Sequence, residues 1–132
     1  MESFRKVVVD KDFLFWILSS QKKGKSRIVR IILDSVKTIL VPLYALIEIA
    51  ESHRKDLKKL LLEIEKLKKL KVVPIDSKIL ILSLEMSGKY NIPLRLSIYA
   101  AISILNKCPI LSYNSAFDKI KEIRRTDILS FV

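Results

Sequence analysis

The stretch KVVVDKDFLFW, residues 6–16, joins an apolar β-branched run to an apolar helix-like segment through a carboxylate, Asp10. Lys6–Val9 is typical of a buried strand, and Asp12–Ser20 is typical of a short helix with Asp12 as its N-cap. An unpaired charge is costly to bury. Asp10 is therefore expected to be either a helix cap or part of a charged site at the edge of a sheet.

Strands and helices are expected to alternate along the rest of the chain. Further strands are predicted at Thr38–Val41, Lys71–Val73 and Ile110–Ser112, with one more at Thr126–Leu129. Helices are predicted at Arg27–Val36, Leu43–His53, Lys55–Leu70, from the capping Asp76 through Tyr90, and at Leu94–Asn106. This alternation predicts a three-layer α/β/α fold with a parallel sheet of about five strands, forming a single domain over residues 1–132. In such sheets, sites form beyond the carboxyl ends of the strands, where Asp10 stands.

The helix predicted at Lys55–Leu70 has a strong amphipathic pattern. Its apolar stripe consists of Leu57, Leu60, Leu61, Ile64 and Leu67, at intervals of three and four. Such a stripe packs against a core or against a second protein, and periodicity does not choose between them.

The chain is strongly basic, with 25 Lys and Arg residues against 14 Asp and Glu, a formal net charge of +11. That charge favours contact with a polyanion such as RNA or DNA. A chain with two glycines and many Lys, Glu, Ile and Leu residues is also typical of a thermophile, whose lysines form a solvated surface. Candidate phosphate contacts are Arg95, the basic turn Lys22, Lys23, Lys25 and Arg27, and the cluster Lys119, Lys121, Arg124 and Arg125.

Composition also bears on the compartment. No stretch reaches the ~20 apolar residues of a membrane span, and the most apolar segment, ILVPLYALIEIA, contains Pro42 and Glu48. The N-terminal MESFRK lacks the apolar region of a secretory signal. The single cysteine, Cys108, suits a reducing interior. We therefore expect no membrane contact and a cytoplasmic location.

Three passages together resemble the PIN domain family, including the VapC-type toxin ribonucleases. They are the strand that ends in Asp10, the strand–Pro–helix passage that carries Glu48, and GKYNIPLRLSIYAAISILNKCPILSYNSAF, residues 88–117. In the last passage Tyr99-Ala100-Ala101 is similar to the family's penultimate helix, Pro109-Ile110-Leu111-Ser112 to its fourth strand, and Phe117 to the aromatic that closes the following loop. The resemblance runs from Val7 to about Leu129.

The resemblance implies a site in which clustered carboxylates hold Mg²⁺ or Mn²⁺. Asp10 and Glu48 match the first two acids, and Asn114 stands at the fourth, where its amide oxygen is a candidate ligand. Leu96 stands where the third acid is expected. Asp10, Glu48 and Asn114 are therefore the predicted metal and catalytic residues, with weak or absent metal binding.

A few further side chains have candidate roles around that set. Ala116 occupies the place of an occasional supporting acid, and Ser97 is a candidate to hold a metal-bound water. Asp12 is a candidate helper, although the cap role explains it better. His53 is expected at a solvated helix end, and Cys108 as a small core residue.

Two functions follow from the resemblance. The first is a metal-dependent endoribonuclease of the toxin type, with RNA as substrate and an antitoxin protein as partner. The second is a non-catalytic PIN homologue that binds RNA or a protein through the same cleft, which the replaced acids favour. A purely structural subunit is a third alternative. The resemblance also implies a homodimer, held by apolar residues of the helices that flank the sheet.

Overall fold

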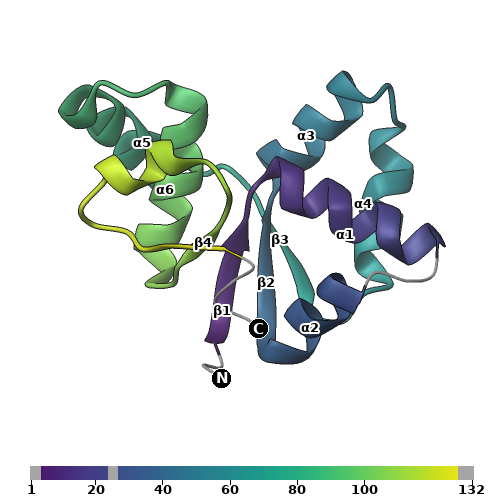
Figure 1. Ribbon diagram of the computed structural model, residues 1–132. Coiled ribbons are helices and arrows are strands. Elements are labelled where there is room, and N and C mark those ends of the chain that lie inside the picture. The colour runs from purple at the N-terminus through teal and green to yellow at the C-terminus, as the bar shows by residue number, and fades with distance from the viewer. Residues whose placement is uncertain (1–3, 24–26, 128–132) are drawn as a thin grey trace.

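The computed structural model describes residues 4–23 and 27–127. The elements in chain order are β1 (Phe4–Val9), α1 (Lys11–Lys23), α2 (Arg27–Ser35), β2 (Val36–Pro42), α3 (Leu43–Ser52), α4 (Leu57–Glu65), β3 (Leu70–Val73), α5 (Ser77–Tyr90), α6 (Leu94–Asn106), β4 (Ile110–Leu111), a 3₁₀ turn η1 (Ser115–Lys119) and β5 (Arg125–Thr126). Figure 1 shows α1 to α4 on one side of the sheet and the α5–α6 pair on the other. The three-layer α/β/α prediction is confirmed.

The sheet has five parallel strands in the order β3-β2-β1-β4-β5. The central strand is β1, in which Val8 lies in register with Leu40 of β2 and Ile110 of β4. Val7, Val8 and Val9 are fully buried, as expected for a strand covered on both faces. The chain therefore leaves β1 at the middle of the carboxyl edge, where Asp10 follows.

The helix that follows β1 is capped by Asp10, so the prediction that Asp12 is the cap was wrong. The N–H of Phe13 donates to Oδ1 of Asp10 at 3.0 Å, and the N–H of Leu14 donates to the Asp10 carbonyl at 3.0 Å. Asp12 lies exposed in the first turn. The helix begins at once because the strand ends at Val9, which leaves Asp10 in the capping position.

The amphipathic helix predicted at Lys55–Leu70 is shorter than expected. It begins at Leu57, after Asp56 accepts hydrogen bonds from two backbone N–H groups, and it ends at Glu65. A turn then leads to β3, which begins at Leu70. Leu60 and Ile64 of the apolar stripe are buried, and Leu57, Leu61 and Leu67 pack against the core at its margin. The stripe is therefore used for the core.

The ends of other elements differ from their predicted positions by a few residues. The basic turn predicted at 21–26 is partly helical, since α1 continues to Lys23, while residues 24–26 lie outside the described part of the chain. The last strand is Arg125–Thr126 rather than Thr126–Leu129, of which residues 128 and 129 are not described. The turn η1 replaces a predicted loop. Among the described residues, no helix combines the length and apolar character that spanning a membrane requires.

Candidate functional site

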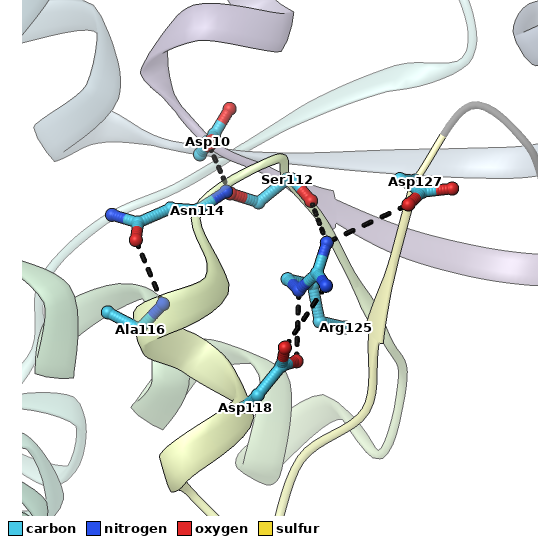
Figure 2. A network of polar contacts seen from close by, with 7 residues as sticks. All are labelled: Asp10, Ser112, Asn114, Ala116, Asp118, Arg125 and Asp127. Carbon is cyan, nitrogen blue, oxygen red and sulfur yellow. Dashed lines mark hydrogen bonds and ion pairs between the residues drawn. The ribbon is translucent and has the colours of Figure 1, made fainter.

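Asp10 is the centre of a polar network at the carboxyl edge of the sheet (Figure 2). Its side chain is 8% exposed, and its Oδ2 accepts a hydrogen bond from the hydroxyl of Ser112 at 2.5 Å. Because Oδ1 caps α1, both carboxylate oxygens already have partners. Burial raises the pKa of the Asp10 carboxyl, and the hydrogen bonds from Phe13 and Ser112 oppose that rise. Asp10 is thus both a helix cap and part of a charged site.

Ser112 connects Asp10 to the loop that follows β4. Its fully buried hydroxyl accepts the N–H of Asn114 at 2.9 Å, while its carbonyl accepts Nη1 of Arg125 at 3.1 Å. Arg125 in turn holds Asp118 through Nε and Nη2, at 2.9 and 3.1 Å. Figure 2 shows how these contacts join the ends of β1, β4 and β5. The edge beside Asp10 is therefore fixed by protein groups on three strands.

Asn114 is exposed and is the N-cap of η1, where its Oδ1 accepts the N–H of Ala116 at 3.0 Å. In Figure 2 its amide oxygen is turned toward Ala116 and away from Asp10. The only link drawn from Asn114 to Asp10 is its backbone N–H through Ser112. The role predicted for its side chain, that of a metal ligand, stays a prediction.

Glu48 comes from α3, which follows β2, the strand next to β1. It is half-buried, and its Oε1 accepts the hydroxyl of Tyr99 at 2.6 Å. Tyr99, on α6, is buried; burial, the hydrogen bond to Glu48 and the charges of Glu48 and Asp10 all raise its pKa. Tyr99 therefore lies within electrostatic reach of both predicted acids.

Arg95 lies near the same group, on the exposed first turn of α6. Burial and the charge of Glu48 raise the pKa of Tyr44, and Arg95 opposes that rise. The ring of Tyr44 lies 6.2 Å from the ring of Tyr99, edge to face. Arg95 is thus a cation on the Glu48 side of the site.

No carboxylate stands at the positions where the resemblance predicts the remaining acids. Leu96 is buried, Ser97 is fully buried with its hydroxyl donating to the Pro93 carbonyl at 3.3 Å, and Ala116 is half-buried. Residues 4–23 and 27–127 contain no group of three or more His, Cys, Asp or Glu side chains placed to hold a metal ion. Mg²⁺ and Mn²⁺ prefer anionic oxygens, and the two carboxylates here already accept hydrogen bonds from protein groups. This donor set does not fit a resident divalent metal.

The described residues of the basic turn lie away from these groups. Lys22 and Lys23 end α1, which extends ~20 Å from its start beside Asp10, and Arg27 is exposed at the start of α2. Lys25 is not in the described part of the chain. In the C-terminal basic cluster Lys119, Lys121 and Arg124 are exposed, whereas Arg125 is held by Asp118.

His53 and Cys108 lie outside this polar network, and the contacts of each have a structural explanation. The imidazole of His53 stacks on the ring of Phe15, with centroids 3.9 Å apart. Burial raises the pKa of Cys108 to about 11, so its thiol is protonated at neutral pH.

Sequence reasoning missed the two hydroxyls that hold the acids, those of Tyr99 and Ser112. One signal was available for Tyr99, because it stands in a helical face of small and apolar residues, SIYAAIS, and a buried tyrosine hydroxyl needs a partner. The partner itself is 51 residues away and carries no local signal.

A five-stranded parallel sheet between helical layers, with acids held at its carboxyl edge, defines a three-layer α/β/α domain. The model of the PIN domain matches residues 7–123, and the chain belongs to this family. No curated protein matches it in sequence.

Solved structures resemble the chain at low identity. DNA-bound VapBC from Salmonella typhimurium has a TM-score of 0.71 at 16% identity, covering 97% of this chain and 99% of that one. VapBC2 from Rickettsia felis, bound to a promoter DNA fragment, has a TM-score of 0.68 at 12% identity, covering 92% and 98%. FitAcB from Neisseria gonorrhoeae has a TM-score of 0.65 at 12% identity, covering 93% and 98%. At this identity the likeness concerns the fold.

Proposed function

We propose that this chain is a PIN-domain protein of the toxin–antitoxin type whose metal-dependent ribonuclease activity is impaired. Membership of the PIN family and the likeness in fold to VapBC and FitAcB support the class. The observation that carries the impairment is the lack of a carboxylate at the other two expected positions, where Leu96 is buried and the amide oxygen of Asn114 caps η1. On this proposal the partners are RNA and an antitoxin protein, and the protein acts in the cytoplasm.

The physical reason concerns the negative charge that the site offers a metal ion. The hydrogen bonds from the N–H of Phe13 and the hydroxyl of Ser112 already offset part of the charge of Asp10. Each carboxylate removed from a site lowers its negative charge, and neither Leu96 nor the amide of Asn114 replaces that charge. We therefore expect weak binding of Mg²⁺ or Mn²⁺ and slow or absent RNA cleavage.

The proposal is tested by restoring the acids. Leu96→Asp combined with Asn114→Asp should raise Mn²⁺ affinity, because each carboxylate adds charge and a hard oxygen ligand. Without metal the added charges repel one another, so this double variant should lose stability in EDTA and regain it with Mn²⁺.

The measurement is calorimetric titration of Mn²⁺ into the wild type, the double variant, and the double variant carrying Asp10→Ala. The Asp10→Ala protein is the control, since it should lose the gained affinity. RNA cleavage is followed in the same three proteins. Tight Mn²⁺ binding and cleavage by the wild type, unchanged by the added acids, would contradict the proposal.

A second candidate function is RNA binding without cleavage. The net charge of +11 and the exposed Arg95 beside the Glu48 group support it. Binding of this kind rests on phosphate contacts and needs no metal, so it should persist in EDTA and weaken steeply with salt. A fluorescence titration with single-stranded RNA in EDTA tests it, and no binding at low salt would reject it.

A further inference from the structure

Tyr113 is an exposed aromatic side chain in the loop that follows β4 at the carboxyl edge of the sheet. Its ring stacks on the ring of Phe13 in α1, with the centroids 4.8 Å apart and the planes at 27°. Phe13 is 1% exposed, whereas Tyr113 is 56% exposed. The core therefore fixes the lower ring of the pair. A ring that is stacked on one face and still more than half exposed leaves its other face accessible to a second flat group.

The residues that fix this ring pair also hold Asp10. The N–H of Phe13 donates to Oδ1 of Asp10 at 3.0 Å, and the hydroxyl of Ser112, the residue before Tyr113, donates to Oδ2 at 2.5 Å. The N–H of Asn114, the residue after Tyr113, donates to the Ser112 hydroxyl at 2.9 Å. Tyr113 is thus held from both sides in the chain and from below by Phe13. A group stacked on its ring would lie at the same edge of the sheet as Asp10.

The surroundings of Tyr113 are polar, which favours a nucleobase over an apolar protein surface. The next two side chains, Asn114 and Ser115, are exposed, whereas an apolar partner needs a contiguous apolar patch. Burial and the charge of Asp127 raise the pKa of Tyr113, so its hydroxyl is protonated at neutral pH. Nη1 of Arg125 lies 3.8 Å from the Asp127 carboxylate and offsets its charge. The net charge of +11 attracts a polyanion to the protein as a whole.

We propose that Tyr113 is a stacking platform for one nucleobase of single-stranded RNA, which its ring holds at the carboxyl edge beside Asp10. The inference rests on the proposed binding of RNA and adds the contact that places a nucleotide at the predicted acids. It does not depend on a bound metal. Every base has a π face, so the platform tolerates any base. It selects unpaired strands, because the bases of a duplex are already stacked on their neighbours.

The first test separates the ring from the apolar volume of the side chain. Tyr113→Leu keeps an apolar contact with Phe13 but removes the π face. In a fluorescence titration in EDTA at low salt, it should bind a labelled oligouridylate of about eight nucleotides about tenfold more weakly than the wild type. Tyr113→Phe keeps the ring and should bind within about twofold of the wild type. The log–log salt slope should be unchanged in both variants, because no phosphate contact is lost.

The matched control for the first test is Leu62→Ala on α4, which changes an apolar side chain that is 49% exposed and lies on another element. It should bind the oligouridylate as the wild type does. Circular dichroism and urea unfolding check that every variant is folded. Should Tyr113→Leu fail to fold, Tyr113→Trp decides. Its larger π face should bind at least as tightly as the wild type, and weaker binding would overturn the platform.

The second test removes the bases from the RNA. The wild type should bind an abasic strand of the same length about tenfold more weakly than the oligouridylate at equal salt, and Tyr113→Leu should bind the two strands with similar affinity. A wild type that binds both strands equally, or a Tyr113→Leu protein that keeps the preference for bases, would overturn the platform and leave RNA binding in place. Absence of oligouridylate binding by the wild type at low salt would reject RNA binding itself, and the platform with it.

Discussion

The two predicted acids are held in different ways, although both belong to the carboxyl edge of the sheet. Asp10 is 8% exposed, and its two oxygens serve a backbone N–H and a buried hydroxyl. Glu48 is half-buried, and one of its oxygens accepts a hydrogen bond from Tyr99. Asp10 therefore helps to hold α1 and β4 to the central strand, whereas Glu48 is a side chain on a helix surface that accepts a hydrogen bond from Tyr99.

This difference shows that a residue at a position typical of a catalytic acid, such as Asp10, can also stabilise the fold. In Asp10 the cap and the Ser112 contact would persist in the absence of any metal, because both partners are protein groups. In Glu48 the half-buried carboxylate retains contact with solvent. Variants that change Asp10 and Glu48 one at a time test this difference.

Removal of the Asp10 side chain should have the largest effect. Asp10→Ala deletes the N-cap of α1, worth about 1 kcal/mol, and leaves the buried Ser112 hydroxyl without its acceptor, which costs about 1–3 kcal/mol. We expect the free energy of unfolding in urea to fall by about 2 kcal/mol or more. Glu48→Gln, measured alongside, should change it by less than about 1 kcal/mol. Equal losses in the two variants would break the comparison.

The pH dependence of the free energy of unfolding should differ between the wild type and the Asp10→Asn variant. Because burial raises the pKa of Asp10 above 3.8 in the folded state, this group contributes most stability below pH 3.8 and loses that contribution as the pH rises through its folded pKa. Relative to Asp10→Asn, the wild type should therefore become less stable as the pH increases from about 4 to 7. Urea unfolding of both proteins at each pH measures the difference. An opposite slope would mean that the hydrogen bonds outweigh burial.

Loss of the Tyr99 hydroxyl should have a smaller effect on stability. Tyr99→Phe removes the contact with Glu48, for which we expect about 1 kcal/mol, and it releases a carboxylate oxygen. Mn²⁺ affinity should consequently stay equal or rise, which calorimetric titration measures. The matched control is Tyr90→Phe, which removes a hydroxyl that contacts Glu122 on the surface. A drop in Mn²⁺ affinity specific to Tyr99→Phe would show that this hydroxyl supports a metal site.

The sequence predicted the layers, the parallel sheet and the place of Asp10, because β-branched runs and helical periodicity are local signals. It did not decide which aspartate caps α1, since Asp10 and Asp12 are equally suitable residues. The choice depends on where β1 ends, and the N–H of Asp10 still reaches the Leu111 carbonyl at 3.4 Å. The end of α4 was missed because the segment between Glu65 and Leu70 contains neither Gly nor Pro.

The candidate site was less accessible to sequence reasoning than the fold. Asp10 and Ser112 are 102 residues apart, and only the pairing of β1 with β4 brings them together. The side chain of Asn114 matched a family position, yet its amide oxygen serves the short turn that follows. Local capping of this kind competes with ligand binding for the same oxygen, and a motif does not show which of the two a residue performs.

The smallest expected effect concerns RNA affinity and the exposed Arg95 on the Glu48 side of the site. If single-stranded RNA contacts this side, Arg95→Ala should lower the affinity at low salt and reduce the log–log salt slope by about 0.7, the value for one phosphate contact. Arg27→Ala removes an equally exposed cation beyond the far end of α1 and is the matched control. Neither change should alter the urea unfolding curve, because both side chains are exposed. Equal slopes for both variants and the wild type would place the RNA elsewhere, whereas a loss confined to Arg27→Ala would locate it on the basic turn. A loss confined to Arg95→Ala would make the Glu48 side a nucleic-acid surface and leave Asp10 as the structural partner.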